Sequence, residues 1–132
     1  MGLILGYFVF IDLGNGCLGS KFGHLGRPSL LTESAVRRPE PISNDIWVGD
    51  YDSLWLDSSN PPTQTQGRLL IRPRSASQYF LEWRDEQNLD HEPLFWGEGM
   101  ISNGQLVGSY WNEVIQRTLP NRRDLRHAPM NI

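Results

Sequence analysis

The stretch FWGEGMISNGQLVGSYW, residues 95–111, has the pattern of two strands that fold back on each other. Asn103 and Gly104 lie at its centre, and Asn-Gly favours a type I′ turn, which needs a positive φ at both positions. Counting outward from this turn predicts five cross-strand pairs: Ser102 with Gln105, Met100 with Val107, Gly99 with Gly108, Gly97 with Tyr110, and Trp96 with Trp111. The Gly99–Gly108 pair leaves a gap in the side-chain layer, which either a neighbouring strand or a ligand can fill.

Further strands are predicted on the N-terminal side of this hairpin. Residues 46–57, IWVGDYDSLWLD, alternate between two faces. One of these faces carries Trp47, Gly49, Tyr51, Ser53 and Trp55. Residues 67–74 and 78–84 are expected to form another strand pair, in which Tyr79, Leu81 and Trp83 share a face.

Residues 3–24 predict another hairpin, because Asn15-Gly16 repeats the turn signal. A turn centred there places Ile11 opposite Ser20 and Val9 opposite Phe22. The better core face then consists of Tyr7, Val9, Ile11, Leu13, Leu18 and Phe22. Rings on both faces of this hairpin also make it a candidate surface for forming a homo-oligomer.

The whole chain of 132 residues is expected to form one domain, residues 1–132. The pattern of short strands and turns predicts an all-β fold, an antiparallel barrel or half-open barrel of about eight strands. Residues 25–45 contain three prolines and are expected to be an irregular connection that plugs or crosses one end of the sheet. The piece SLLTESAVRR within it could form one or two helical turns or an edge strand. Residues 120–132 are expected to be a loose tail.

The composition argues against several classes of function. The net charge is −3, whereas proteins that neutralise nucleic-acid phosphates usually carry a basic excess, so we expect no nucleic-acid partner. Cys17 is the only cysteine, which excludes an internal disulfide. The apolar segment MGLILGYFVFID lacks a positively charged start and is too short to span a bilayer. We therefore expect a cytoplasmic protein with no membrane partner.

No local motif for catalysis, a cofactor or a metal appears in the sequence. His24, His91 and His127 lack metal-ligand spacing, so no metal site and no cofactor are predicted. Glu82 and Glu98 lie on predicted strands of neighbouring hairpins. If both faced inward they would form an acid/base pair or pair with an arginine, and if both faced outward they would be surface charges.

Aromatic faces are the strongest functional lead, because rings with a few polar groups suit a pocket for a flat or apolar small molecule. The alternative is an ordinary packed core. The candidate ligand-binding residues are Trp47, Tyr51, Ser53, Trp55, Tyr79, Trp83, Trp96, Tyr110 and Trp111.

The segments GDYDSLW, QYFLEW and GQLVGSYW, within residues 46–111, are similar to the glycine-plus-aromatic strands of small up-and-down barrels. The chain thus resembles the lipocalin, fatty-acid-binding and avidin group. It departs from the lipocalin Gly-x-Trp signature, because Tyr51 stands in place of the tryptophan after Gly49. The resemblance implies a barrel with an internal cavity, and no binding residue is carried over from it.

Three functions follow as hypotheses. The first is a non-catalytic domain that binds a small apolar or aromatic molecule, or a partner, through its inward rings. The second is a barrel-type enzyme that uses Glu82, Glu98 or an arginine inside the cup. The third is a structural or oligomerisation module that pairs through the N-terminal hairpin.

Overall fold

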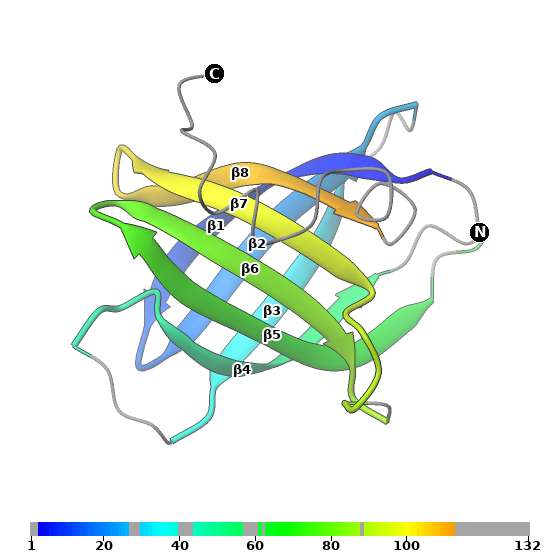
Figure 1. The fold of residues 1–132 in the computed structure, drawn as a ribbon, viewed down its shortest axis with the longest axis horizontal. Helices are drawn as coiled ribbons and strands as arrows, with labels where there is room; N and C mark the ends of the chain where they lie inside the picture. The colour runs from blue at the N-terminus through cyan, green and yellow to red at the C-terminus, as the bar shows by residue number, and fades with distance from the viewer. Residues whose placement is uncertain are drawn as a thin grey trace.

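The computed structural model describes residues 3–26, 30–39, 44–56, 61, 63–87 and 89–112. Within these residues, antiparallel strands form a closed barrel in which each strand pairs with the next and the last pairs with the first (Figure 1). The strands are β1 (Leu5–Gly14), β2 (Cys17–His24), β3 (Leu31–Arg37), β4 (Gly49–Leu56), β5 (Gln64–Ser75), β6 (Gln78–Asp85), β7 (Phe95–Ser102) and β8 (Gln105–Asn112). The predicted all-β class is confirmed, and the barrel is closed rather than half-open. No helix in the described part of the chain has the length and apolar character needed to cross a membrane.

The hairpin of β7 and β8 has the predicted register. Asn103 and Gly104 form its turn with φ values of 52° and 74°. All five predicted pairs, from the pair next to the turn to Trp96 with Trp111, occur in the ladder. A two-residue turn therefore set the pairing of both strands along their whole length.

The hairpin of β1 and β2 has a different register, so its predicted pairs are wrong. Ile11 pairs with Gly19 and Phe8 pairs with Phe22, because a β-bulge interrupts the ladder just before Gly14. Gly14 adopts φ 86° immediately before the Asn-Gly turn. Glycine takes this conformation without a steric penalty, and the bulge adds one residue to β1 relative to β2.

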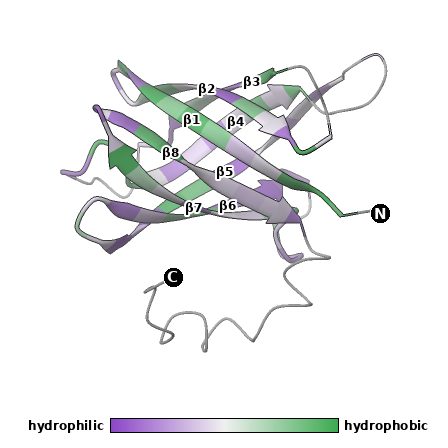
Figure 2. Cartoon of the chain, turned by 90° about the horizontal axis from the view of Figure 1, so that it is seen from above, coloured by the Kyte–Doolittle hydropathy of each residue, from purple (hydrophilic) through white to green (hydrophobic). Residues whose placement is uncertain are grey.

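This bulge reverses the faces of β1, so the predicted core face of that strand is also wrong. Phe8 and Phe10 are 2% and 0% exposed, whereas Tyr7 and Ile11 are 46% and 44% exposed. A one-residue change of register moves every side chain of a strand to the opposite face. β1 therefore contributes two phenylalanine rings to the core and an apolar row to the surface. Figure 2 shows hydrophobic colouring along much of β1.

The prediction of an irregular connection over residues 25–45 is wrong for β3, which occupies part of this segment and completes the barrel between β2 and β4. The strand alternative for this piece is the one observed, although the closed barrel makes it an internal strand and not an edge strand. Burial alternates along β3: Leu31, Glu33 and Ala35 are buried, and the residues between them are exposed. The predicted loose tail, residues 120–132, lies outside the described residues.

Residues 44–48 close one end of the barrel. Trp47 is 5% exposed and packs in the core. The Tyr51 hydroxyl donates to the Trp47 carbonyl at 2.8 Å, and the Tyr79 hydroxyl donates to Asp45 Oδ2 at 2.6 Å. Arg37 Nη2 donates to the Asp45 carbonyl at 3.0 Å. The side chains of Arg37, Tyr51 and Tyr79 and this short segment therefore form a polar plug at this end of the core.

The Gly99–Gly108 step faces packed protein. A Cβ added to Gly99 would lie 3.2 Å from Phe8 Cζ, and one added to Gly108 would meet the backbone of Glu98 and Gly99. β1 thus fills the space that the two glycines leave. Of the two alternatives predicted for this gap, a neighbouring strand and not a ligand occupies it.

Candidate functional site

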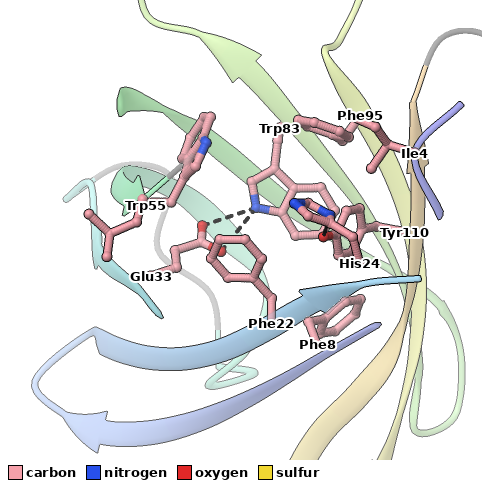
Figure 3. Close-up of a pocket in the computed structure, with 10 residues that line it drawn as sticks. Ile4, Phe8, Phe22, His24, Glu33, Trp55, Trp83, Phe95 and Tyr110 are labelled. Carbon is pink, nitrogen blue, oxygen red and sulfur yellow. Dashed lines mark hydrogen bonds between the residues drawn. The ribbon is translucent and has the colours of Figure 1, made fainter. Parts of the chain in front are cut away.

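The end of the barrel opposite the plug holds a cavity of about 80 Å³ (Figure 3). Six aromatic rings line it, each from a different strand: Phe8, Phe22, Trp55, Trp83, Phe95 and Tyr110. These rings pack mainly edge to face, as Phe95 and Tyr110 do at a centroid distance of 5.6 Å. Ile4, Leu56 and Phe95 are partly exposed and lie at the mouth, so the cavity has an apolar entrance.

Glu33 on β3 places a carboxylate in this ring-lined space (Figure 3). Its Oε2 atom accepts hydrogen bonds from the Ser53 hydroxyl at 2.5 Å and from Trp83 Nε1 at 3.0 Å. Among the described residues, its Oε1 atom receives a longer contact of 3.3 Å, from Trp83 Nε1. Oε1 therefore keeps the capacity to accept a further hydrogen bond from a molecule in the cavity.

Burial is the main influence on the pKa of Glu33. It raises the pKa of the carboxyl group from its ordinary value of 4.5 to about 7, against the lowering effect of the hydrogen bonds from Ser53 and Trp83. Removing a carboxylate from water disfavours its charged form, and two hydrogen-bond donors recover only part of that cost. Near neutral pH the group is therefore divided between its charged and neutral forms.

Tyr110 and His24 form a second polar pair on the cavity wall (Figure 3). The Tyr110 hydroxyl lies 2.5 Å from His24 Nδ1 and donates to the Gly23 carbonyl at 3.1 Å. Burial, followed by the charge of Glu33, raises the pKa of this tyrosine. The phenol stays neutral at physiological pH and can serve as a hydrogen-bonding group in the cavity.

The nine candidate residues separate into three places. Trp55, Trp83 and Tyr110 line the cavity, and Ser53 bonds the carboxylate within it. Trp47, Tyr51 and Tyr79 lie at the plugged end, where burial and the Asp45 carboxylate raise the pKa of Tyr79 to about 12. Trp96 and Trp111 pair with each other on the outer face of β7 and β8, away from the cavity.

The carboxylates that the sequence singled out lie on the outer face of the sheet. Glu82 pairs with Arg84 at 3.1 Å, and Glu98 pairs with Arg74 at 3.2 Å. Each glutamate points outward, because the residue before it, Leu81 or Gly97, is buried and side chains alternate between the two faces of a strand. The alternative of surface charges was therefore the correct one for these two residues.

Glu33, by contrast, was missed. The sequence carries a partial signal, because apolar Leu31 and Ala35 lie two residues to either side of Glu33, with polar Thr32 and Ser34 between them. The neighbouring prolines favour an irregular connection over a strand in this segment. A glutamate on the apolar side of an alternating strand is expected to be a buried carboxylate, and buried carboxylates mark candidate functional sites.

Comparisons of the chain with protein-family models, with curated proteins and with solved structures gave no match. Within residues 3–26, 30–39, 44–56, 61, 63–87 and 89–112, no group of three histidine, cysteine or acidic side chains converges as metal ligands would. In this part of the chain, the cavity wall consists of aromatic and aliphatic side chains with the Glu33 carboxylate and the Tyr110–His24 pair.

Proposed function

We propose that this barrel binds a small, mainly apolar molecule in the cavity beside Glu33. The observation that carries the proposal is a buried carboxylate facing a space walled by aromatic rings. Ligand sites are typically apolar concavities with a few polar groups that fix orientation. A carboxylate kept at the cost of a large shift in its pKa is typical of functional sites rather than of packing.

The barrel architecture supports the same proposal. An eight-strand antiparallel meander that closes between β8 and β1 is the architecture implied by the resemblance to the lipocalin, fatty-acid-binding and avidin group. One end is plugged and the other has an apolar mouth, so a ligand has one route of entry. We extend the resemblance to function only at this level: a cup that holds a small molecule.

Indole N–H signals in two-dimensional NMR spectra provide a direct test, because the five tryptophans lie in different places. Titration with n-hexanol, a neutral apolar probe, should shift the indole signals of Trp83 and Trp55 in a saturable manner. Trp47 at the plug and Trp96 on the outer face should shift much less. Equal shifts at all positions, or no saturable shift at Trp83, would contradict the proposal.

A matched pair of variants controls for binding elsewhere on the surface. Ile4→Trp enlarges a side chain at the mouth and should block the cavity, whereas Leu3→Trp enlarges the preceding, exposed side chain. Saturable shifts at Trp83 should disappear in Ile4→Trp and persist in Leu3→Trp.

A second candidate function is proton transfer within the same cavity, because a pKa near 7 suits a general acid or base at neutral pH. Glu33 would move the proton, and the Tyr110–His24 pair would hold the reacting oxygen. The two functions differ in one measurable respect. If the barrel transfers protons, it should accelerate deuterium exchange at the carbon beside the carbonyl of a ketone such as methyl butyl ketone. If it only binds the ketone, the exchange rate should not change.

A further inference from the structure

The cavity, as the described residues line it, contains one acid, Glu33, and no lysine or arginine. Resting on the proposed function, we propose that it binds the ammonium head of a small organic amine, with Glu33 as the counter-ion and the apolar part directed to the mouth. The chemical class is thus a primary or methylated alkylamine, not a neutral lipid and not a fatty acid.

The first argument is the charge balance around the carboxylate. In the part of the chain that the structure describes, the arginines that form ion pairs do so on the outer face, with Asp50, Asp52, Glu82 and Glu98. Arg37 donates a hydrogen bond to the Asp45 carbonyl in the plug, at the opposite end of the barrel. Within the described residues, the neutral donors Ser53 and Trp83 bond Glu33. A cation in the cavity would supply an opposite charge that these residues do not provide.

The second argument is the wall. Aromatic rings attract cations through their negative faces, and amine-binding sites commonly combine several rings with a carboxylate. Trp55 lies opposite Glu33 in the β3–β4 ladder, and the Trp83 indole donates to the carboxylate itself. An ammonium group at Oε1 would therefore meet both a charge and π surfaces.

The third argument is size. The volume of about 80 Å³ is roughly half that of the cavity of about 150 Å³ which accepts benzene. The space suits a compact head group better than a whole ring or lipid. Ile4, Leu56 and Phe95 at the mouth offer apolar contacts to a short alkyl tail that leaves the cavity.

The fourth argument concerns the cost of burying an ion pair, which often exceeds the Coulombic gain. In this barrel folding has already removed the carboxylate from water, and the raised pKa of Glu33 records that penalty. Binding a cation then requires desolvation of the amine alone. A carboxylic acid ligand would instead place a second negative charge beside the first, and the site should reject it.

Other titratable groups near Glu33 are few. His24 from β2 and Tyr110 from β8 line the cavity with it. The lining side chains of β1, β4, β6 and β7 are uncharged, and the buried inner residues of β5 are apolar. Tyr51, Tyr79 and Arg37 belong to the plug. A protonated His24 would also repel a cation, so the pH dependence must be compared with that of a Glu33 variant.

Three probes with the same tail test the inference: n-hexylamine, n-hexanol and hexanoate, followed at the Trp83 indole signal. At about pH 8 the amine is protonated, as a lysine side chain is, and Glu33 is mostly ionised. The amine should then bind at least roughly tenfold more tightly than the alcohol, with hexanoate weakest. At about pH 6 this preference should fall by roughly tenfold, because Glu33 becomes mostly protonated.

Glu33→Gln keeps the shape of the side chain and removes its charge. It should lose the preference for the amine at both pH values and still bind the alcohol. If the wild type binds the alcohol or hexanoate as tightly as the amine, or more tightly, the inference is overturned and the proposed function stands. An amine preference that persists in Glu33→Gln would have the same consequence. No saturable binding of any probe by the wild type would overturn the proposed function itself.

Discussion

Glu33 connects protonation to folding at the scale of a single residue. The pKa of its carboxyl group is about 7 in the folded protein and 4.5 in an unperturbed chain. The folded state therefore holds the proton more tightly than the unfolded state. Its contribution to stability is complete below the unfolded value and is lost as the pH rises through the folded value.

The size of this loss leads to a prediction about Glu33→Gln. A shift from 4.5 to about 7 corresponds to roughly 3 kcal/mol. The free energy of unfolding of the wild type should fall by about this amount relative to Glu33→Gln between pH 4.5 and about pH 8. Urea unfolding of both proteins at each pH measures the difference.

Glu92→Gln removes an exposed carboxylate and serves as the control for a change of net charge. If Glu33→Gln and the wild type show the same pH dependence, Glu33 does not titrate as a buried group.

At the scale of elements, glycines set how closely neighbouring strands approach. Gly108 on β8 faces Gly99 on β7, and Phe8 from β1 covers the step. Gly14 on β1 adopts a positive φ and creates the bulge that turns Phe8 inward. A glycine in one strand therefore determines which ring fills the gap beside a glycine in another.

We predict that Gly108→Ala destabilises the barrel by about 2 kcal/mol or more, because the added methyl group would overlap the backbone of β7 rather than a movable side chain. Chemical denaturation gives the change in the free energy of unfolding. Ser109→Ala alters the next residue, which is exposed, and should change stability by less than about 0.5 kcal/mol. Similar effects of the two substitutions would show that β7 and β8 are not closely packed at this step.

The whole molecule presents an apolar row on its outer surface along β1. Leu5, Tyr7, Ile11 and Leu13 are 36% to 64% exposed. Val9 in the same row pairs with Val107 on β8, which extends the apolar surface to the next strand. Contiguous exposed apolar surface marks interaction sites, so we propose that two copies of the chain associate through this face.

Sedimentation velocity over a range of concentrations should show a reversible dimer. Tyr7→Lys combined with Ile11→Lys should shift the protein to a monomer, because a symmetric interface would carry each added charge twice. Val36→Lys, which places the same charge at an exposed apolar residue of β3, should leave the dimer intact. A wild type that stays monomeric at every concentration would exclude this interface.

Local sequence patterns determined the fold class and part of the site. Alternation placed Ser53 and Trp55 on the inner face of β4 and Trp83 on that of β6, and the Asn103–Gly104 turn determined the register of β7 and β8. Strand periodicity and turn chemistry act between residues close in sequence, so a pattern is sufficient to predict them.

Only the tertiary structure decided which inward residues share a space. Trp47 and Trp55 lie on the same predicted face but at opposite ends of the barrel, one in the plug and one beside the cavity. Trp96 faces outward although its partner strand contributes Tyr110 to the cavity. The position of a residue along the barrel axis depends on closure and strand stagger, which link segments far apart in the chain. The raised pKa of Glu33 has the same origin, because burial within the closed barrel causes it.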